Sequence, residues 1–557
     1  MATLLSSTVV DRIWSHAETK PDAPYAHVVS PAGIETIDWA KLRGRASAYA
    51  RAFAAAGVTR GSIVLIFLGH GPDLFYSYFG AMALGAAPSF MPLPSPKQDA
   101  SHYWTSHAVL FDRIKPAAVL TTAAHLAEMK ASGDFAGEST FLTVEEVDLD
   151  DDAPFVPEIS PDDVGLLQHS SGTTGLKKGV ALSHRAIAAQ LDSYGEAIKL
   201  TDDDVIVSWL PVYHDMGLIA CTLLPAYHGL PLVSMDPFHW LTKPGMLLDH
   251  AETYGGTLIW LPNFAFQHLA RVSPPKRLKA KDLSGIRAIM NCSEVCRAAT
   301  FDAFATTFAP VGIRPAQLQV CYAAAETVFA MSQTTLDAPV RALSVDTASL
   351  IDGEVVVVEE GAPGSQRLLS CGTAISALDV QIRAEDGTIL PEDTVGEVTI
   401  TGDCLFDGYY NLPDITARKL RDGIYYTSDL GFYHAGELYV LGRRDDVIVV
   451  NGRNYMAHDL EAVANRIAGL KPGRNVAVGI YNERLGSNEI CLVAERDPDA
   501  GEIDADAVAA EIREALLDQA DAPTADVRVV EPGWLVKTTS GKISREKNAV
   551  KYQEQFG

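Results

Sequence analysis

The stretch Ser170–Gly179, SSGTTGLKKG, combines small hydroxyl residues, glycines and a lysine in one loop. It follows an apolar run at Val164–Leu167 and precedes another at Val180–Leu182. Such a loop lets successive backbone N–H groups turn toward a phosphate, and Lys178 adds a cation for the same anion. The spacing is not that of a Walker loop, whose lysine opens a helix, because here the next helix begins later, capped by Ser183. The loop is therefore predicted to bind phosphate groups; a flexible surface loop is the alternative.

Four further segments carry polar side chains suited to binding a nucleotide. In CYAAAET, Tyr322 can stack on a base and the carboxylate of Glu326 can hold a Mg²⁺ ion, although a packed loop with an exposed glutamate is the alternative. Asp429, in YYTSDLG, suits the hydroxyls of a ribose, and Arg443, in GRRDD, offers a guanidinium group. Near the carboxyl-terminal end, VKTTSGK is a second Gly/Ser/Thr-rich loop, which ends in Lys542. Each of these segments is a weak indication when taken alone.

His214 and Asp215, in PVYHDMGL, come directly after an apolar run. The carboxyl ends of strands are where active-site groups lie in α/β sheets. His214 is therefore a candidate for the same site, with a structural histidine as the alternative.

The elements that must position these groups show two different patterns of secondary structure. In the first third, the apolar run 62–68 (SIVLIFL) is followed by a helical pattern at 72–85, which is typical of βαβ units around a buried sheet. From about Gly396 onward, short strands are joined by turn residues, and Asn451-Gly452 is a strong hairpin signal. Further buried strands are predicted at 202–211 and 256–262. In the final segment, helices and strands are predicted to alternate. The helices are expected at 459–468 and 504–518, and the strands at 475–481 and 489–494.

The composition of the chain argues for some classes of protein and against others. The 557 residues are 47% hydrophobic and 21% charged, as expected for large buried cores. A net charge of −26 argues against a general nucleic-acid binder, because phosphate neutralisation needs a basic surface. The seven cysteines lack metal-ligand spacing, and neither a secretory signal nor a run of about twenty apolar residues is present. We expect a reduced, cytoplasmic protein without a transmembrane segment, whose oligomeric state the sequence leaves open.

In this order, SSGTTGLKKG, HDMGL, the Tyr322–Glu326 turn, the TSD segment, GRRDD and TTSGK resemble the core motifs of the acyl-activating, or adenylate-forming, enzyme superfamily. The resemblance covers nearly the whole chain. It implies an α/β fold whose amino-terminal body, residues 1–443, has two α/β subdomains and a distorted β-barrel, followed by a small mobile α+β domain at 444–557. The implied activity is the ATP- and Mg²⁺-dependent conversion of a carboxylic acid to an acyl-AMP, with release of pyrophosphate.

The resemblance also implies roles for individual residues. Glu326 is similar to the Mg²⁺-binding glutamate, Lys542 to the mobile lysine of the adenylating conformation, and Asp445 to the hinge about which the small domain rotates. His214 would border the point where the substrate carboxylate meets the α-phosphate. The nucleotide-binding set implied by the motifs is Ser171, Gly172, Thr173, Thr174, Gly175, Lys178, Ser293, Glu294, Tyr322, Asp429 and Arg443.

Within the superfamily, the details look most like the fatty acyl-AMP ligases. The segments LPVYHDMGL, 260–270 and 291–315 are similar to that branch. A long connection near 333–369, with the strand-like GEVVVVEE, matches the position of the insertion that restrains domain rotation in these ligases and disfavours coenzyme A. The implied acceptor is then the phosphopantetheine thiol of an acyl carrier protein. A plain surface excursion is the alternative for the connection, because loop insertions cost little.

Two other readings of the whole chain remain, an acyl-CoA synthetase that uses free coenzyme A and a non-catalytic acyl- or nucleotide-binding relative. The acid is also open: a fatty acid or another apolar acid, such as a natural-product carboxylate, fits. Trp209, Met216 and Phe264 are candidate walls of an apolar acyl pocket, with membership of the core as the alternative.

Lys542→Ala is expected to nearly abolish acyl-AMP formation and to leave the fold intact. The ammonium group would stabilise negative charge on the pentacovalent phosphorus and on the leaving pyrophosphate. Acid-dependent release of pyrophosphate measures the loss, and a variant that releases pyrophosphate at the wild-type rate would refute the role of Lys542.

Overall fold

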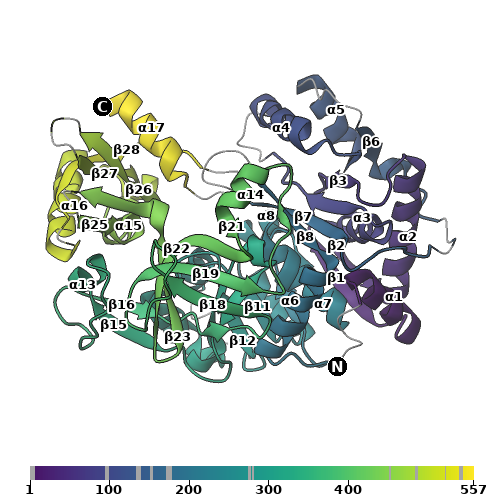
Figure 1. The fold of residues 1–557 in the computed structure, drawn as a ribbon, viewed down its shortest axis with the longest axis horizontal. Coiled ribbons are helices and arrows are strands. Elements are labelled where there is room, and N and C mark those ends of the chain that lie inside the picture. Colours follow the sequence, from purple (N-terminus) through teal and green to yellow (C-terminus); the bar gives the residue numbers. More distant parts are fainter. Residues whose placement is uncertain are drawn as a thin grey trace.

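The computed structural model describes residues 7–94, 100–132, 139–150, 153, 155–170, 178–273, 278, 281–450, 453–482, 484, 487–520, 522–537 and 543–556. It has a large body and a smaller α+β unit at the carboxyl-terminal end, which lies to one side of the body (Figure 1). The predicted combination of an α/β body with a smaller carboxyl-terminal domain is confirmed. Within the described residues, no helix combines the length and the apolar character needed to cross a bilayer.

A nine-stranded sheet forms the centre of the body. Its six central strands pair in parallel, and antiparallel strands close both edges. The central strands are buried apolar runs, as expected for parallel strands covered on both faces. The strand order is β17 (Thr373–Ala374), β14 (Ala330–Gln333), β13 (Leu318–Ala323), β12 (Ala288–Asn291), β11 (Leu258–Leu261), β9 (Ile206–Ser208), β10 (Leu232–Met235), β1 (Pro24–Ser30) and β2 (Gly33–Asp38).

A second, four-stranded parallel sheet accounts for the βαβ pattern of the first third. The predicted strand at 62–68 is β3, and the predicted helix at 72–85 is α3, which begins at a proline as helices often do. The sheet order is β4 (Ala87–Phe90), β3 (Ile63–Ile66), β5 (Ala118–Thr121) and β6 (Thr140–Thr143), with helices α2 (Trp39–Ala55), α3 (Pro72–Ala83), α4 (Ala100–Ile114) and α5 (Ala123–Ser132).

The remaining helices of the body connect and cover these sheets. They are α1 (Val9–Thr19), α6 (His184–Ala197), α7 (Leu224–His228), α8 (Pro237–Thr242), α9 (Met246–Tyr254), α10 (Asn263–Val272), α12 (Ala298–Phe308), α13 (Thr347–Ile351) and α14 (Pro413–Lys419), together with the π-helix η2 (Met216–Leu223).

Antiparallel pairing dominates from Val164 to Arg443 outside the central sheet. The strands β7 (Val164–Ser170) and β8 (Lys178–Ser183) form a hairpin, and β20 (Gly408–Tyr409) adds to β8. Strands β18 (Leu378–Arg383), β19 (Gly396–Gly402), β22 (Ile424–His434), β21 (Leu420–Arg421) and β23 (Glu437–Arg443) form a five-stranded sheet.

The connection near 333–369 contains β15 (Ala342–Asp346), α13 and β16 (Ser365–Leu369). The expected strand GEVVVVEE is wrong in part, because only isolated bridges form there, at Glu354 and Val357. Val356 and Val357 are 46% and 49% exposed, so this apolar run lacks the covering layer that would complete a strand in a sheet.

The carboxyl-terminal unit has its own apolar core, which includes Ile448, Leu460, Leu492, Ile512 and Leu516. Its elements are β24 (Val447–Val450), β25 (Arg453–Met456), α15 (Ala457–Ala464), β26 (Leu470–Asn482), β27 (Ser487–Arg496), α16 (Ala505–Ala520), β28 (Thr524–Val530) and α17 (Arg545–Phe556). The pairing of Val450 with Arg453 agrees with the predicted hairpin, whose turn lies outside the described residues. The helix predicted at 459–468 starts two residues earlier and ends at Ala464, and the strand β28 and helix α17 were not predicted.

Gly80→Ala is expected to lower the midpoint of thermal unfolding. An added Cβ at Gly80 of α3 would lie 2.6 Å from the carbonyl oxygen of Ala46 and 2.6 Å from Cβ of Tyr49, both on α2. Overpacking of this kind costs about 1–3 kcal/mol. Gly44→Ala is the matched control, because Gly44 lies on the exposed face of α2 with nothing within 4 Å of the added Cβ. The control should match or exceed the wild-type midpoint, since alanine favours helix; an unchanged midpoint in Gly80→Ala would contradict the close packing of α2 on α3.

Candidate functional site

Five of the predicted site residues lie at the carboxyl edge of the parallel strands. Trp209 follows β9, and Phe264 follows β11. Ser293 and Glu294 follow β12, while Tyr322 ends β13. Because parallel strands all finish at the same edge, residues that are more than 100 positions apart in sequence meet there. The backbone N–H of Phe264 donates to Oε2 of Glu294 at 3.2 Å, which ties two of these strand ends together.

Glu326 is linked to the phosphate loop through a tyrosine that sequence reasoning missed. The hydroxyl of Tyr409, on β20, donates to Oε1 of Glu326 at 2.6 Å. Nζ of Lys178, at the start of β8, lies 5.3 Å from the centre of the Tyr409 ring, a cation–π contact. Burial, together with the Glu326 carboxylate, raises the pKa of Tyr409, so its hydroxyl keeps the proton that it donates. Only a GYY sequence marks Tyr409, and it carries no period or spacing that points to a site.

Asp429 and Arg443 form the second centre of the site. They face each other in the pairing of β22 with β23, and Nε of Arg443 lies 3.5 Å from Oδ1 of Asp429. Tyr322 was expected to stack on a base, and its hydroxyl donates to Oδ2 of Asp429. The Asp429 side chain is 15% exposed and that of Arg443 is 54% exposed. Burial raises the pKa of Asp429, and the Arg443 guanidinium opposes that rise by favouring the charged form.

Three residues in the left-handed region of backbone space flank these centres. Ser293 has φ 72°, Val328 has φ 67° and Ser428 has φ 66°. Such conformations cost on the order of 1–3 kcal/mol for residues other than glycine, and a β-branched valine is the least suited to them. Val328 comes two residues after Glu326, and Ser428 directly precedes Asp429, so the strain lies beside the two carboxylates of the site.

His214 lies on a segment that is anchored to the phosphate hairpin. Nε2 of Gln168, on β7, donates to the carbonyl of Tyr213 at 2.9 Å. The ring of His214 lies 4.8 Å from the ring of Tyr213, and the carbonyl of His214 accepts from the N–H of Leu218 at 2.8 Å. His214 is thus the neighbour of a residue that contacts β7, the strand that leads into the phosphate loop.

The candidate acyl pocket is aromatic. Trp209 stacks on Trp240 with ring centres 3.7 Å apart and planes 1° apart. Phe264 meets Trp209 edge-on, with ring centres 6.2 Å apart, and is 44% exposed. Met216 is buried at the start of η2. The structure therefore brings Trp209 and Phe264 together at the sheet edge, while Met216 belongs to the same core cluster as Trp209.

Several predicted residues lie outside the described part of the chain. These are Ser171, Gly172, Thr173, Thr174 and Gly175 of the phosphate loop, and Lys542. Their flanks are described. The hairpin β7–β8 carries the phosphate loop, and Ser183 caps α6 by accepting from the N–H of Ala186 at 3.3 Å, as expected. The Lys542 loop is closed at its base, where the N–H of Ser544 donates to the carbonyl of Val536 at 3.0 Å.

The hinge candidate Asp445 lies in the single-turn helix η6 (Arg444–Asp446), directly between β23 of the body and β24 of the carboxyl-terminal unit. Arg545, at the start of α17, connects this hinge to α15: its Nε lies 3.5 Å from Oδ1 of Asp446, and its NH2 group 3.0 Å from Oε1 of Glu461.

The donor set suits a magnesium ion that is held jointly with a nucleotide. Among the residues that the structure describes, no group of three or more His, Cys, Asp or Glu side chains is arranged to hold a metal. Glu326 supplies one carboxylate, with Oε1 oriented by Tyr409. Mg²⁺ keeps several waters and is usually bound through one or two carboxylates plus substrate phosphates, so a single glutamate fits this ion.

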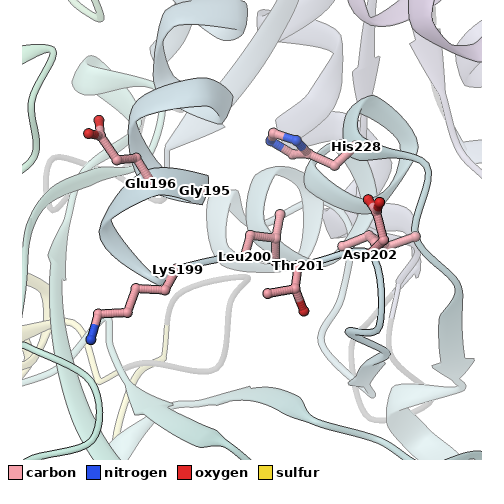
Figure 2. Close-up of a pocket in the computed structure, with 8 residues that line it drawn as sticks. Gly195, Glu196, Lys199, Leu200, Thr201, Asp202 and His228 are labelled. Carbon is pink, nitrogen blue, oxygen red and sulfur yellow. The ribbon is translucent and has the colours of Figure 1, made fainter.

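A surface pocket of about 230 Å³ lies elsewhere, at the carboxyl end of α6. Lys199, Thr201, Asp202 and His228 line it (Figure 2). Thr201 and Asp202 precede β9, so the pocket lies at the amino edge of the central sheet, opposite the edge that carries Trp209 and Glu294. It is therefore separate from the candidate site.

Comparisons with known proteins agree with this geometry. The AMP-binding enzyme family matches residues 13–410. A putative acyl-CoA synthetase of Caulobacter vibrioides is 31% identical over 93% of this chain and 91% of that protein. JamA of Moorena producens, a medium-chain-fatty-acid–(acyl-carrier-protein) ligase, is 28% identical over 89% of this chain and 86% of its own length. A solved structure from work on fatty acyl-adenylate ligases of E. coli and L. pneumophila superposes with a TM-score of 0.88 at 25% identity, over 99% of this chain and 98% of that one.

Asp429→Asn is expected to weaken the binding of AMP about thirtyfold. If Asp429 binds the ribose, the neutral amide would lose a charge-assisted hydrogen bond worth about 2 kcal/mol and would leave Arg443 without its counter-charge. Titration calorimetry with AMP measures the change. Asp379→Asn, on the exposed side of β18 in the same sheet, is the control and should bind AMP like the wild type. Equal affinities for Asp429→Asn and the control would exclude Asp429 from the nucleotide site.

Proposed function

Because the chain belongs to the family of AMP-binding enzymes, we propose that it activates an apolar carboxylic acid as its acyl-AMP and passes the acyl group to the phosphopantetheine thiol of a carrier protein. The prediction of an adenylate-forming ligase, similar to the fatty acyl-AMP ligases, is confirmed by the family match and by the relatives. The observation that carries the rest of the proposal is a pair of links at the end of β13: Lys178 lies against Tyr409, which binds Glu326, and Arg443 lies against Asp429, which binds Tyr322.

Each of these groups is assigned to one part of ATP. Asp429 and Arg443 would hold the ribose, and the loop that ends at Lys178 would hold the β- and γ-phosphates. Glu326 would bind Mg²⁺, which supplies positive charge to the phosphates. In the first step, an oxygen of the substrate carboxylate forms a bond to the α-phosphorus, and the bond from that phosphorus to the pyrophosphate oxygen breaks. No general base is needed, since a carboxylate with a pKa near 4–5 is already ionised at pH 7.

Two anions must approach each other in this step. Their repulsion would be offset by the cations at the site and by the backbone N–H groups of the phosphate loop. This matters more in a chain of net charge −26, whose overall field repels ATP. The site therefore has to concentrate positive charge locally, and Lys178, Arg443 and Lys542 are the side chains proposed to do so.

The aromatic wall favours an apolar acid. Trp209 and Trp240, which stack at the end of β9, are 5% and 0% exposed, so Phe264, which is 44% exposed, is the member that presents apolar surface, at the end of β11. Each buried methylene contributes about 0.8 kcal/mol to binding, so such a wall selects longer or larger acids over acetate.

The acceptor follows from how the connection near 333–369 joins the two parts of the molecule. Leu343 and Leu368 of β15 and β16 pack against Phe432 and Tyr439 of the body. Nε2 of Gln366, on β16, donates to Oδ1 of Asp459, on α15, at 3.1 Å. The helix α13 lies beside the carboxyl-terminal unit (Figure 1).

Arg297 of the body adds to this contact, with NH1 3.0 Å from Oδ1 of Asp459. These interactions hold the unit against the body and would oppose the rotation that opens a path for free coenzyme A. JamA, named for transfer to a carrier protein, supports the same acceptor. The Caulobacter relative, named a putative acyl-CoA synthetase, supports the second candidate, transfer to coenzyme A.

Pyrophosphate release with acetate, octanoate and palmitate tests the activation step and the acid class. Octanoate or palmitate should support release at least tenfold faster than acetate, because more apolar surface is buried on the aromatic wall. Incubation of the acyl-AMP with holo carrier protein or with coenzyme A then tests the acceptor, with thioester formation followed by mass spectrometry. We expect thioester on the carrier protein only. Acyl-CoA as the main product would place the protein with the acyl-CoA synthetases. The absence of pyrophosphate release with all three acids would refute the proposed substrate class.

A further inference from the structure

Lys419 is a cation that neither the sequence motifs nor the proposed mechanism uses. It is the last residue of α14, and its side chain is only half-buried. Its Nζ donates to Oγ of Ser428, its one hydrogen-bond acceptor in the part of the chain that the structure describes. An ammonium group has three donors, so this one contact leaves two of them available.

The α14 helix connects the two centres of the site. At one end, Oγ1 of Thr416 accepts from the backbone N–H of Tyr409 at 2.9 Å, and Tyr409 holds Glu326. Lys419 follows Thr416 by three residues, which places both on the same face of the helix. At the other end, Lys419 meets Ser428, the neighbour of Asp429 on β22. The helix packs beside β21 and β22 (Figure 1). Lys419 therefore lies beside the neighbour of Asp429, on the helix face that also contacts Tyr409, and it interacts electrostatically with both Glu326 and Asp429.

The contact with Ser428 requires an unfavourable backbone conformation at that serine. Ser428 has φ 66°, a backbone conformation that glycine adopts readily, Asn and Asp adopt less readily, and other residues rarely adopt. Its backbone N–H donates to Oε1 of Glu397 at 2.8 Å, which holds the residue in this conformation. A glycine would fit the backbone better but would have no hydroxyl to orient the ammonium group of Lys419.

The electrostatic surroundings agree with an anion-binding role. Burial lowers the pKa of Lys419, and the carboxylates of Glu397, Asp445 and Glu326 oppose that change. The ammonium group is partly desolvated, and two of its donors are available. A cation in that state interacts more strongly with an incoming anion than one in bulk water does.

In a nucleotide, the α-phosphate lies between the ribose and the β- and γ-phosphates. We propose that Lys419 binds the α-phosphate of the nucleotide, and of the acyl-AMP after pyrophosphate has left. This inference rests on the proposed function, because it takes Asp429 as the ribose contact and Glu326 as the metal contact. It assigns to the body a cation that stays with the adenylate through both steps, whereas Lys542 belongs to the carboxyl-terminal unit and serves the first step only.

The distinguishing measurement is the affinity for AMP compared with that for adenosine, which has no phosphate. Lys419→Gln should weaken the binding of AMP about tenfold to a hundredfold, the range expected for a charge-assisted hydrogen bond, and should leave adenosine binding within about twofold of the wild type. Lys419→Arg should keep part of the AMP affinity, because guanidinium also binds phosphate. Lys199→Gln, which removes an exposed lysine paired with Asp337, is the control and should change neither affinity.

An equal loss of AMP and adenosine affinity in Lys419→Gln would overturn the proposal, since it would mean that Lys419 only supports the fold around Asp429. Unchanged AMP affinity would overturn it as well. If Lys419→Gln has a lower thermal midpoint than the wild type, Lys419→Arg is the deciding variant. The ratio of its AMP affinity to its adenosine affinity is then compared with the same ratio in Lys419→Gln, and equal ratios count against a phosphate contact. A wild-type protein that binds neither ligand would instead refute the proposed function, so the two failures are distinguishable.

Discussion

An acidic chain that must bring a carboxylate to a polyphosphate faces electrostatic repulsion at its own active site. The net charge is −26, and the substrates proposed for the site are both anions. The described cations near the two carboxylates of the site, Lys178, Lys419 and Arg443, each lie against a partner that orients them: a tyrosine ring, a serine hydroxyl and an aspartate. Preorganised charge of this kind costs no reorganisation when the substrate arrives.

The parallel sheet determines where that charge can act. Strands β9, β11, β12 and β13 end at one edge, and each end contributes a candidate side chain. Neighbouring strands are about 4.8 Å apart, so the three steps from β13 to β9 separate the nucleotide and acyl candidates by roughly 14 Å. The aromatic wall and the nucleotide contacts thus occupy different ends of one edge, and the α-phosphate and the substrate carboxylate must meet between them. The strained residues Val328 and Ser428 lie where the chain turns to present Glu326 and Asp429.

The carboxyl-terminal unit is joined to the body through a small set of polar contacts. The first turn of α15 binds Arg297 of the body and Gln366 of the connection near 333–369 through Asp459, and Glu461 on the same helix binds Arg545. Arg545 follows the Lys542 loop and also contacts Asp446 at the hinge. The contacts of Asp459 hold α15 against the body and the connection, and a rotation about the proposed hinge would have to break them.

The sequence by itself determined the local chemistry: which residue types stand in which order, where loops of small hydroxyl residues and glycines fall, and which apolar runs become strands such as β3 and β11. These properties depend on neighbours in the chain, and they were sufficient to recognise an adenylate-forming ligase. GEVVVVEE shows the limit of such reasoning, because a run with strand composition becomes a strand only if another strand and a covering layer are present. The tertiary structure alone decided that Tyr409 holds Glu326, that the hydroxyl of Tyr322 donates to Asp429, and that Lys419 contacts Ser428, the neighbour of Asp429. The first two contacts join residues that are 83 and 107 positions apart, and the third depends on where α14 packs, so no local pattern encodes them.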